Sequence, residues 1–154
     1  SINTISGNGG TGPTTGGIFA FEGGSIFVAD ATISNNVGPA VQAFEVGVLE
    51  VRGSTAVTVP AAGTTVGALV QFGSTLRVRD TASIVSATSH GIQASNNSSV
   101  NIRDGNTVQG NGAGAFGVQC FNSSPMTASA ATLTGNLVAV TGAAGASSGC
   151  NAFP

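Results

Sequence analysis

The chain has 154 residues, of which 24 are glycine, and its four basic and six acidic side chains give a formal net charge of −2. A chain of this length forms about one domain, and a hydrophobic content of 41% is enough to build a core. Four arginines without any lysine exclude the basic surface of a nucleic-acid-binding protein, and the lack of a long apolar run excludes direct insertion into a membrane.

Short segments with alternating apolar residues recur along the chain and predict β-strands. Each repeat contains two apolar residues separated by a single residue, and these pairs recur about every 25 residues. The pairs are Ile26/Val28, Leu49/Val51, Leu76/Val78, Val100/Ile102 and Met126/Ala128. Because side chains alternate between the two faces of a strand, both members of each pair are expected to point into a core.

Two further apolar columns accompany these pairs. The column eight residues before the pair contains Ile18, Val41, Ile92 and Val118. The unit "GALVQFGSTL" at 67–76 is one residue short of this spacing. The column that follows the pair contains Ile5, Ile33, Val57, Ile84, Val108 and Leu133. Three short strands per repeat predict an all-β solenoid, a parallel β-helix of about six coils that spans residues 1–154 as a single domain. The unequal repeat lengths favour the right-handed form.

Polar and aromatic residues also recur at fixed places in the repeat. Asparagines follow the last apolar column by three residues, at Asn8, Asn36, Asn111 and Asn136. Asparagine tolerates left-handed backbone geometry and its amide can bond between coils, so these residues predict an asparagine ladder at a turn. Phenylalanines share another column, at Phe21, Phe44 and Phe121, with Phe72 close by. We expect them to stack inside the solenoid.

With these columns, coil lengths and asparagines, the chain resembles the right-handed parallel β-helix superfamily. This superfamily includes pectate lyases, polygalacturonases, phage tailspikes and autotransporter passenger domains. The resemblance covers nearly the whole chain and is closest in character to the secreted autotransporter-type and tailspike-type solenoids. It implies the fold but leaves the activity open, because the architecture carries many functions.

The catalytic motifs of the superfamily are incomplete in this sequence. The segment "SHGIQAS" at 89–95 is similar to the Gly-His-Gly motif of polygalacturonases and places His90 at the matching position. The paired acids that accompany this motif are missing, and polysaccharide hydrolysis needs two carboxyl groups beside the scissile bond. We therefore expect no catalytic residue, no metal site and no cofactor, and we interpret His90 as a turn residue.

All four arginines are predicted to lie on the outward face of the middle strand, in three successive coils. The residues of this face are Glu50, Arg52, Arg77, Arg79 and Arg103. One interpretation is a solvated ladder of cross-strand charges. The other is a strip that binds an acidic polysaccharide, because the guanidinium fork matches a carboxylate. Other acids are expected in turns: Asp30, Asp80 and Asp104 at the strand ends, and Glu22 and Glu45 stacked in a neighbouring turn.

Cys120 and Cys150 are the only cysteines. With no Cys-x-x-Cys spacing and a single histidine they make a poor metal site, which leaves a disulfide or two buried thiols. We favour the disulfide, which indicates an oxidising compartment. It would fold residues 137–154 under the last coil as a capping tail, with Phe153 as a plug.

Two functions follow from these features. The first is a non-enzymatic, secreted or cell-surface β-solenoid that serves as a structural stalk, an adhesin segment or a self-stacking filament subunit. The second is a carbohydrate-active protein that binds or cleaves an acidic polysaccharide along the arginine-bearing sheet. The N-terminal end carries no capping segment, so we expect either a part of a longer rod or stacking with another copy, end to end or laterally. Either function implies an extracellular or cell-surface location.

Overall fold

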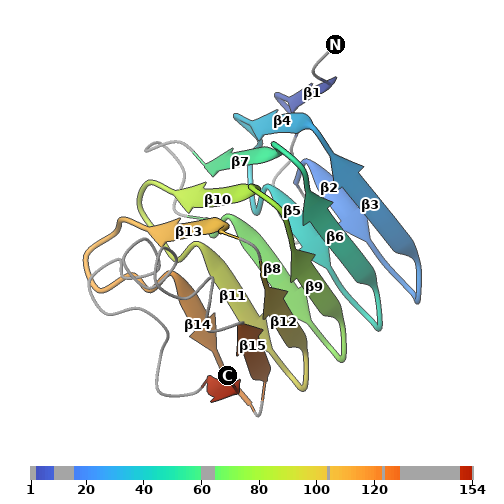
Figure 1. Cartoon of the computed structure of the whole chain (residues 1–154), viewed down its shortest axis with the longest axis vertical. Coiled ribbons are helices and arrows are strands. Elements are labelled where there is room, and N and C mark those ends of the chain that lie inside the picture. The colour runs from blue at the N-terminus through green and yellow to red at the C-terminus, as the bar shows by residue number, and fades with distance from the viewer. Residues whose placement is uncertain are drawn as a thin grey trace.

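Figure 1 presents the computed structural model of the chain, which describes residues 3–8, 16–59, 65–103, 105–122, 124–128 and 150–153. Within these ranges the chain forms β-strands joined by turns, and no helix is present. The strands assemble into three parallel sheets that we name A, B and C, and successive coils stack along one axis. The predicted parallel β-helix is therefore confirmed.

Each full coil contributes one strand to each sheet. Sheet A contains β1 (Asn3–Ser6), β4 (Ala31–Ser34), β7 (Ala56–Val59), β10 (Ser83–Ser86) and β13 (Thr107–Gly110). Sheet B contains β2 (Ile18–Ala20), β5 (Val41–Ala43), β8 (Ala68–Gln71), β11 (Ile92–Ser95) and β14 (Val118–Cys120). Sheet C contains β3 (Ser25–Ala29), β6 (Val48–Arg52), β9 (Thr75–Val78), β12 (Ser99–Ile102), β15 (Pro125–Ala128) and β16 (Asn151–Phe153).

The apolar columns predicted from the sequence form the core. In sheet A the ladder pairs Ile33 with Val57, Val57 with Ile84 and Ile84 with Val108, and all four side chains are 0% exposed. Sheet C adds the inward column that contains Leu49. Because every coil repeats the inward positions of the coil before it, apolar side chains pack above one another along the whole axis.

The predicted repeat differs from the structure in two details. The structure describes about five turns against the six predicted, and Leu133, on which the sixth turn depends, lies outside the described residues. The unit at 67–76 is not short either, since Ala68 pairs with both Val41 and Ile92 and occupies the inward column. Leu69 points outward instead. The local sequence did not settle this choice because Ala68 and Leu69 are both apolar.

The turn between sheets B and C repeats a four-residue geometry. Backbone bonds continue through it from coil to coil: the N–H of Val46 donates to the carbonyl of Phe72, and the N–H of Gly73 to that of Asn96, both at 2.9–3.0 Å. The fourth position holds Ser74, Ser98 and Ser124 in the last three turns, with exposed fractions of 0–1%. Continuous backbone bonds therefore join this turn to the corresponding turns of neighbouring coils and satisfy its polar backbone groups.

The predicted aromatic stack lies on the outside of the solenoid and not in its interior. Phe21 and Phe121 each follow an inward residue of sheet B, Ala20 and Cys120 respectively, so alternation directs their rings outward. Their exposed fractions are 38% and 44%, and Phe72 is 47% exposed. The rings of Phe21 and Phe44 still stack, with centroids 5.9 Å apart.

The described asparagines of the predicted ladder bond through their side chains to backbone groups of a neighbouring coil. The Asn8 N–H donates to Asn36 Oδ1 at 3.0 Å, and Asn36 Nδ2 donates to the Ile5 carbonyl at 3.3 Å. Asn111 Nδ2 donates to the Ser86 carbonyl at 3.1 Å. The left-handed residues in the first two of these turns are Gly7, with φ 69°, and Asn35, with φ 54°, each directly before the predicted asparagine. Asn136 lies outside the described residues.

The C-terminal strand is fastened to the last coil by a disulfide. Cys120 and Cys150 form a disulfide, and Cys150 packs against the core. The next residue, Asn151, begins β16. β16 extends sheet C by pairing with β15. The capping tail was predicted over residues 137–154. Only its end is described, and the side chain of Phe153 lies outside the described part.

Candidate ligand-binding face of sheet C

The arginines predicted for one face do come together on the outward side of sheet C. Glu50 on β6 pairs directly with Arg77 on β9, which places their side chains in one axial column. Arg52 ends β6, and Arg79 and Arg103 follow the partnered residues at the ends of β9 and β12. Arg52, Arg79 and Arg103 therefore form a second column, one residue per coil, parallel to the first.

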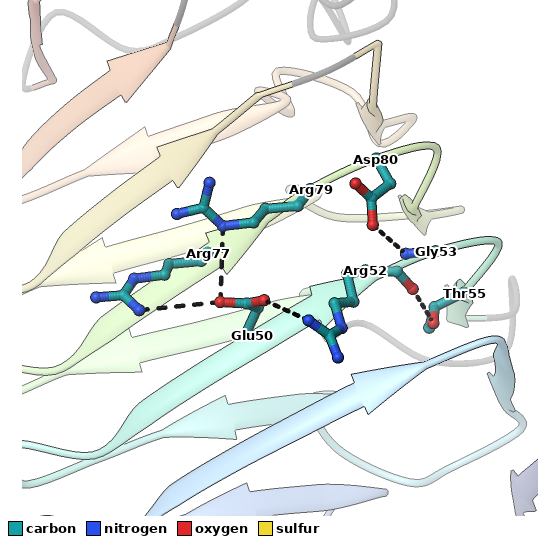
Figure 2. A network of polar contacts seen from close by, with 7 residues as sticks. All are labelled: Glu50, Arg52, Gly53, Thr55, Arg77, Arg79 and Asp80. Carbon is teal, nitrogen blue, oxygen red and sulfur yellow. Dashed lines mark hydrogen bonds and ion pairs between the residues drawn. The ribbon is translucent and has the colours of Figure 1, made fainter.

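Glu50 lies at the centre of this face and contacts three guanidinium groups (Figure 2). Its carboxylate oxygens lie 3.6 Å from Arg52 Nη1, 3.9 Å from Arg77 Nη1 and 3.6 Å from Arg79 Nε. The Glu50 side chain is only 9% exposed, whereas the arginines are 29–51% exposed. One carboxylate thus faces three positive charges, and the cluster keeps an excess of positive charge.

A shallow groove lies on the C-terminal side of Glu50. Its volume is about 380 Å³, and its lining consists of Thr75, Arg77, Arg79, Ser99, Val100, Asn101, Arg103 and Pro125. No acidic side chain contributes to this lining, and Arg103 makes no ion pair with any residue in the described ranges. The groove therefore offers three guanidinium groups, two hydroxyls and an amide. This set suits a ligand that carries carboxylate or sulfate groups and hydroxyls.

The hydroxyls of the groove are held in place by the ladder. Thr75 and Ser99 are register partners on β9 and β12, and their hydroxyl oxygens are 3.0 Å apart. Of the five predicted site residues, the groove contains Arg77, Arg79 and Arg103. Glu50 and Arg52 lie beside it and set the charge of its rim. The hydroxyl lining could not be predicted from the sequence, since serine and threonine occur throughout the chain.

The described aspartates bond to a turn and not to the arginine groove. Asp80 Oδ2 accepts the Gly53 N–H at 3.0 Å, and Asp30 Oδ1 accepts both the N–H and the hydroxyl of Ser54. These donors hold the pKa of the Asp30 carboxyl below its ordinary value, with the Ser54 N–H as the main cause. A side chain at Gly53 would collide with the Asp30 carboxylate. Asp104 lies outside the described residues.

His90 lies away from the arginines, in the turn that leads into sheet B. Its Nδ1 accepts the backbone N–H of Phe116 at 2.8 Å, and its ring stacks on the Phe116 ring at 5.7 Å. Partial burial lowers the pKa of His90. Nδ1 is an acceptor, so the neutral ring carries its proton on Nε2. The described part of the chain contains no group of three or more residues that could hold a metal ion.

Two ladders of side-chain amides were missed by the sequence analysis. Asn122 Nδ2 donates to Asn96 Oδ1 at 2.9 Å, and Gln93 Nε2 donates to Gln119 Oε1 at 2.9 Å. Each pair occupies equivalent positions in two consecutive coils. The two asparagines are 26 residues apart, as are the two glutamines, and this repeat of the same residue type at the coil spacing could have predicted both ladders.

Comparison with known proteins identifies the family and nothing narrower. The family model described as a right handed beta helix region matches residues 1–153, and the chain belongs to this family. This confirms the predicted right-handed form. No curated protein and no solved structure matches the chain. Among the described residues, no helix is long and apolar enough to cross a membrane.

Proposed function

We propose that this chain is a non-enzymatic β-solenoid that serves as a structural stalk, an adhesin segment or a self-stacking filament subunit, outside the cell or at its surface. The observation that carries this proposal is the unbroken pairing of strands in all three sheets across the described coils. Backbone bonds that continue through the turns add to the stiffness of the body. The Cys120–Cys150 disulfide supports an oxidising location.

The charge arrangement argues against hydrolysis. Glu50 is the single acid on the outward face of sheet C in the described coils, and three arginines surround it. Glycoside hydrolysis by the usual route requires two carboxyl groups, separated by about 5 to 10 Å across the bond to be cleaved. Asp30 and Asp80 bond to a turn and supply no such partner for Glu50.

A digestion assay tests the non-enzymatic assignment. The full chain is incubated with polygalacturonate, alginate and a sulfated polysaccharide, and new reducing ends and unsaturated products are measured over a day. We expect no product above the buffer control for the wild-type chain or for Glu50→Gln. Cleavage by the wild-type chain that disappears in Glu50→Gln would overturn the assignment.

A second candidate function is the binding of an acidic polysaccharide along sheet C. The groove favours it, because Arg77, Arg79 and Arg103 line it without any acid. Arginine can contact a carboxylate through two parallel hydrogen bonds, and the hydroxyl and amide groups beside it can bond to sugar hydroxyls. Three of the four basic side chains of the chain therefore line this one groove.

Calorimetric titration with oligogalacturonate tests this second function. The wild-type chain is expected to bind it in a salt-sensitive way and to ignore a neutral oligosaccharide of equal length. Arg77→Ala combined with Arg79→Ala removes two charged donors, each worth about 1.5–3 kcal/mol, and should reduce affinity at least tenfold. Arg52→Ala is the matched control, because Arg52 belongs to the same face but lies outside the groove. Equal binding by the wild-type chain, the double variant and the control would exclude the groove as the binding site.

A further inference from the structure

A second charged surface lies on the turn between sheets B and C in the N-terminal coils. We name it the acidic aromatic strip and define it by Phe21, Glu22, Phe44, Glu45, Val46 and Phe72. Phe21 is 38% exposed, Phe72 47% and Val46 65%. The rings form a continuous series, with centroids 5.9 Å apart for Phe21 and Phe44 and 4.8 Å apart for Phe44 and Phe72. Both glutamates are exposed.

The backbone of this strip is unfavourable for the residues that it contains. Glu22, Glu45 and Val46 have φ of 48°, 49° and 64°. Left-handed geometry costs a residue with a side chain roughly 1–2 kcal/mol, and a β-branched residue is a clear outlier there. In a later coil the same two turn positions hold Asn96 and Asn97, which tolerate this geometry. Charged and apolar side chains thus occupy the strip despite a cost to folding.

Charge is also distributed unevenly along the chain. Residues 1–50 contain four acids and no arginine, and residues 51–154 contain all four arginines and two acids. Because the coils ascend along one axis, the N-terminal half of the solenoid is acidic and the C-terminal half holds the cationic groove. A second copy is therefore a complementary partner for either half.

The spacing of the charges matches as well. Glu22 and Glu45 occupy equivalent positions in consecutive coils, two residues after the paired Ala20 and Ala43. Arg79 and Arg103 also occupy equivalent positions in consecutive coils. Both separations are therefore set by the distance between neighbouring parallel strands, about 4.8 Å. Two carboxylates on one copy can face two guanidinium groups on another without distortion of either backbone.

We propose that the acidic aromatic strip of one copy docks on the arginine groove of a second copy. The glutamates would pair with Arg79 and Arg103, and the exposed phenylalanine rings would take guanidinium groups over their faces. The contact joins two different surfaces of the chain, so it can propagate along a row of copies. The inference rests on the proposed filament function, and it makes the groove a site for which an acidic polysaccharide would compete.

Sedimentation velocity on the full chain tests the docking. At about 20 mM salt the weight-average mass should rise above the 14.8 kDa of one chain as concentration increases, and about 0.5 M salt should reverse the rise by screening the ion pairs. Glu22→Gln with Glu45→Gln should weaken association at least tenfold. Asp30→Asn is the matched control, because it removes an acid from the same half of the molecule but outside the strip. A single-chain mass at all concentrations would overturn the proposal.

A charge exchange separates docking from a folding defect. Glu22→Arg with Glu45→Arg, and Arg79→Glu with Arg103→Glu, should each remain single chains and keep the circular dichroism of the wild type. Mixing the two variants should restore association, since each then supplies the surface that the other lost. Association by either variant alone, or none in the mixture, would contradict the assigned contact. Oligogalacturonate titration of the strip variant, whose groove is intact, shows separately whether polysaccharide binding holds.

Discussion

The residues in the turns must fit a left-handed backbone geometry that most residue types avoid. In the turn between sheets B and C, each described coil contains one or two residues with positive φ, and their chemical type changes along the chain. Glycine and asparagine adopt this geometry at little cost, whereas valine has two Cβ substituents that crowd the backbone. Val46 is the position where local geometry and residue type conflict most.

Replacement of Val46 by glycine should stabilise the isolated chain. The change removes left-handed strain of roughly 1–2 kcal/mol and loses part of that gain to the greater freedom of glycine in the unfolded chain. Urea unfolding at low concentration should report a net gain of about 1 kcal/mol. Val37→Gly is the matched control, because Val37 is 61% exposed against 65% for Val46 but lacks a positive φ, and it should lose stability. A loss of stability in Val46→Gly would exclude strain at this position.

His90 should make the fold sensitive to mild acid. Burial lowers its pKa in the folded chain, and protonation of Nδ1 would break the bond from the Phe116 N–H. Below the ordinary pKa of 6.5 the unfolded chain therefore takes up this proton more readily than the folded chain does. The contribution of His90 to the free energy of unfolding is fully present above that pH and is lost as the pH falls through the pKa of His90 in the folded chain. Urea midpoints measured from pH 7.5 to 5 should decrease. In His90→Asn, which keeps an acceptor, they should stay nearly constant, and an equal decrease would contradict this role.

At the level of strands, the sequence predicts inward positions well wherever polar residues flank apolar ones. Ile33, Val57, Ile84 and Val108 were placed in one column by spacing alone, and the ladder pairs them in that order. The prediction was wrong at Ala68, where adjacent apolar residues fit both faces. The sequence pattern could not predict the groove, because the groove depends on how side chains from three neighbouring strands fill the surface between them.

The disulfide should carry a large share of the stability of the C-terminal end. It joins residues 30 positions apart, and the loss of unfolded-chain entropy gives about 3–4 kcal/mol in the chain-entropy model. Cys120→Ala with Cys150→Ala should lower the free energy of unfolding by about this amount in urea titrations. Reductant should have the same effect on the wild-type chain and none on the double variant. No effect of reductant on the wild-type chain would mean that the bond contributes nothing to folding.

At the level of the molecule, one distance governs both proposed surfaces. The separation of neighbouring strands spaces the carboxylates of the strip and the guanidinium groups of the groove alike. The sequence revealed the members of each column, because every repeat places them at a fixed offset from its apolar residues. It did not reveal that Glu50 contacts three arginines at once, since two of these contacts depend on side-chain conformation within and across strands.

The described coils stack in register about one axis, and a pair of deletions tests this register. Deleting residues 77–100 joins Leu76 to Asn101, the register partner of Arg77, and removes one whole coil. Deleting residues 77–99 differs by a single residue but turns the side chains that follow to the opposite face. Urea unfolding followed by circular dichroism should give a cooperative transition for the first variant and none for the second. Equal behaviour of the two variants would contradict the stacked register on which both proposed surfaces depend.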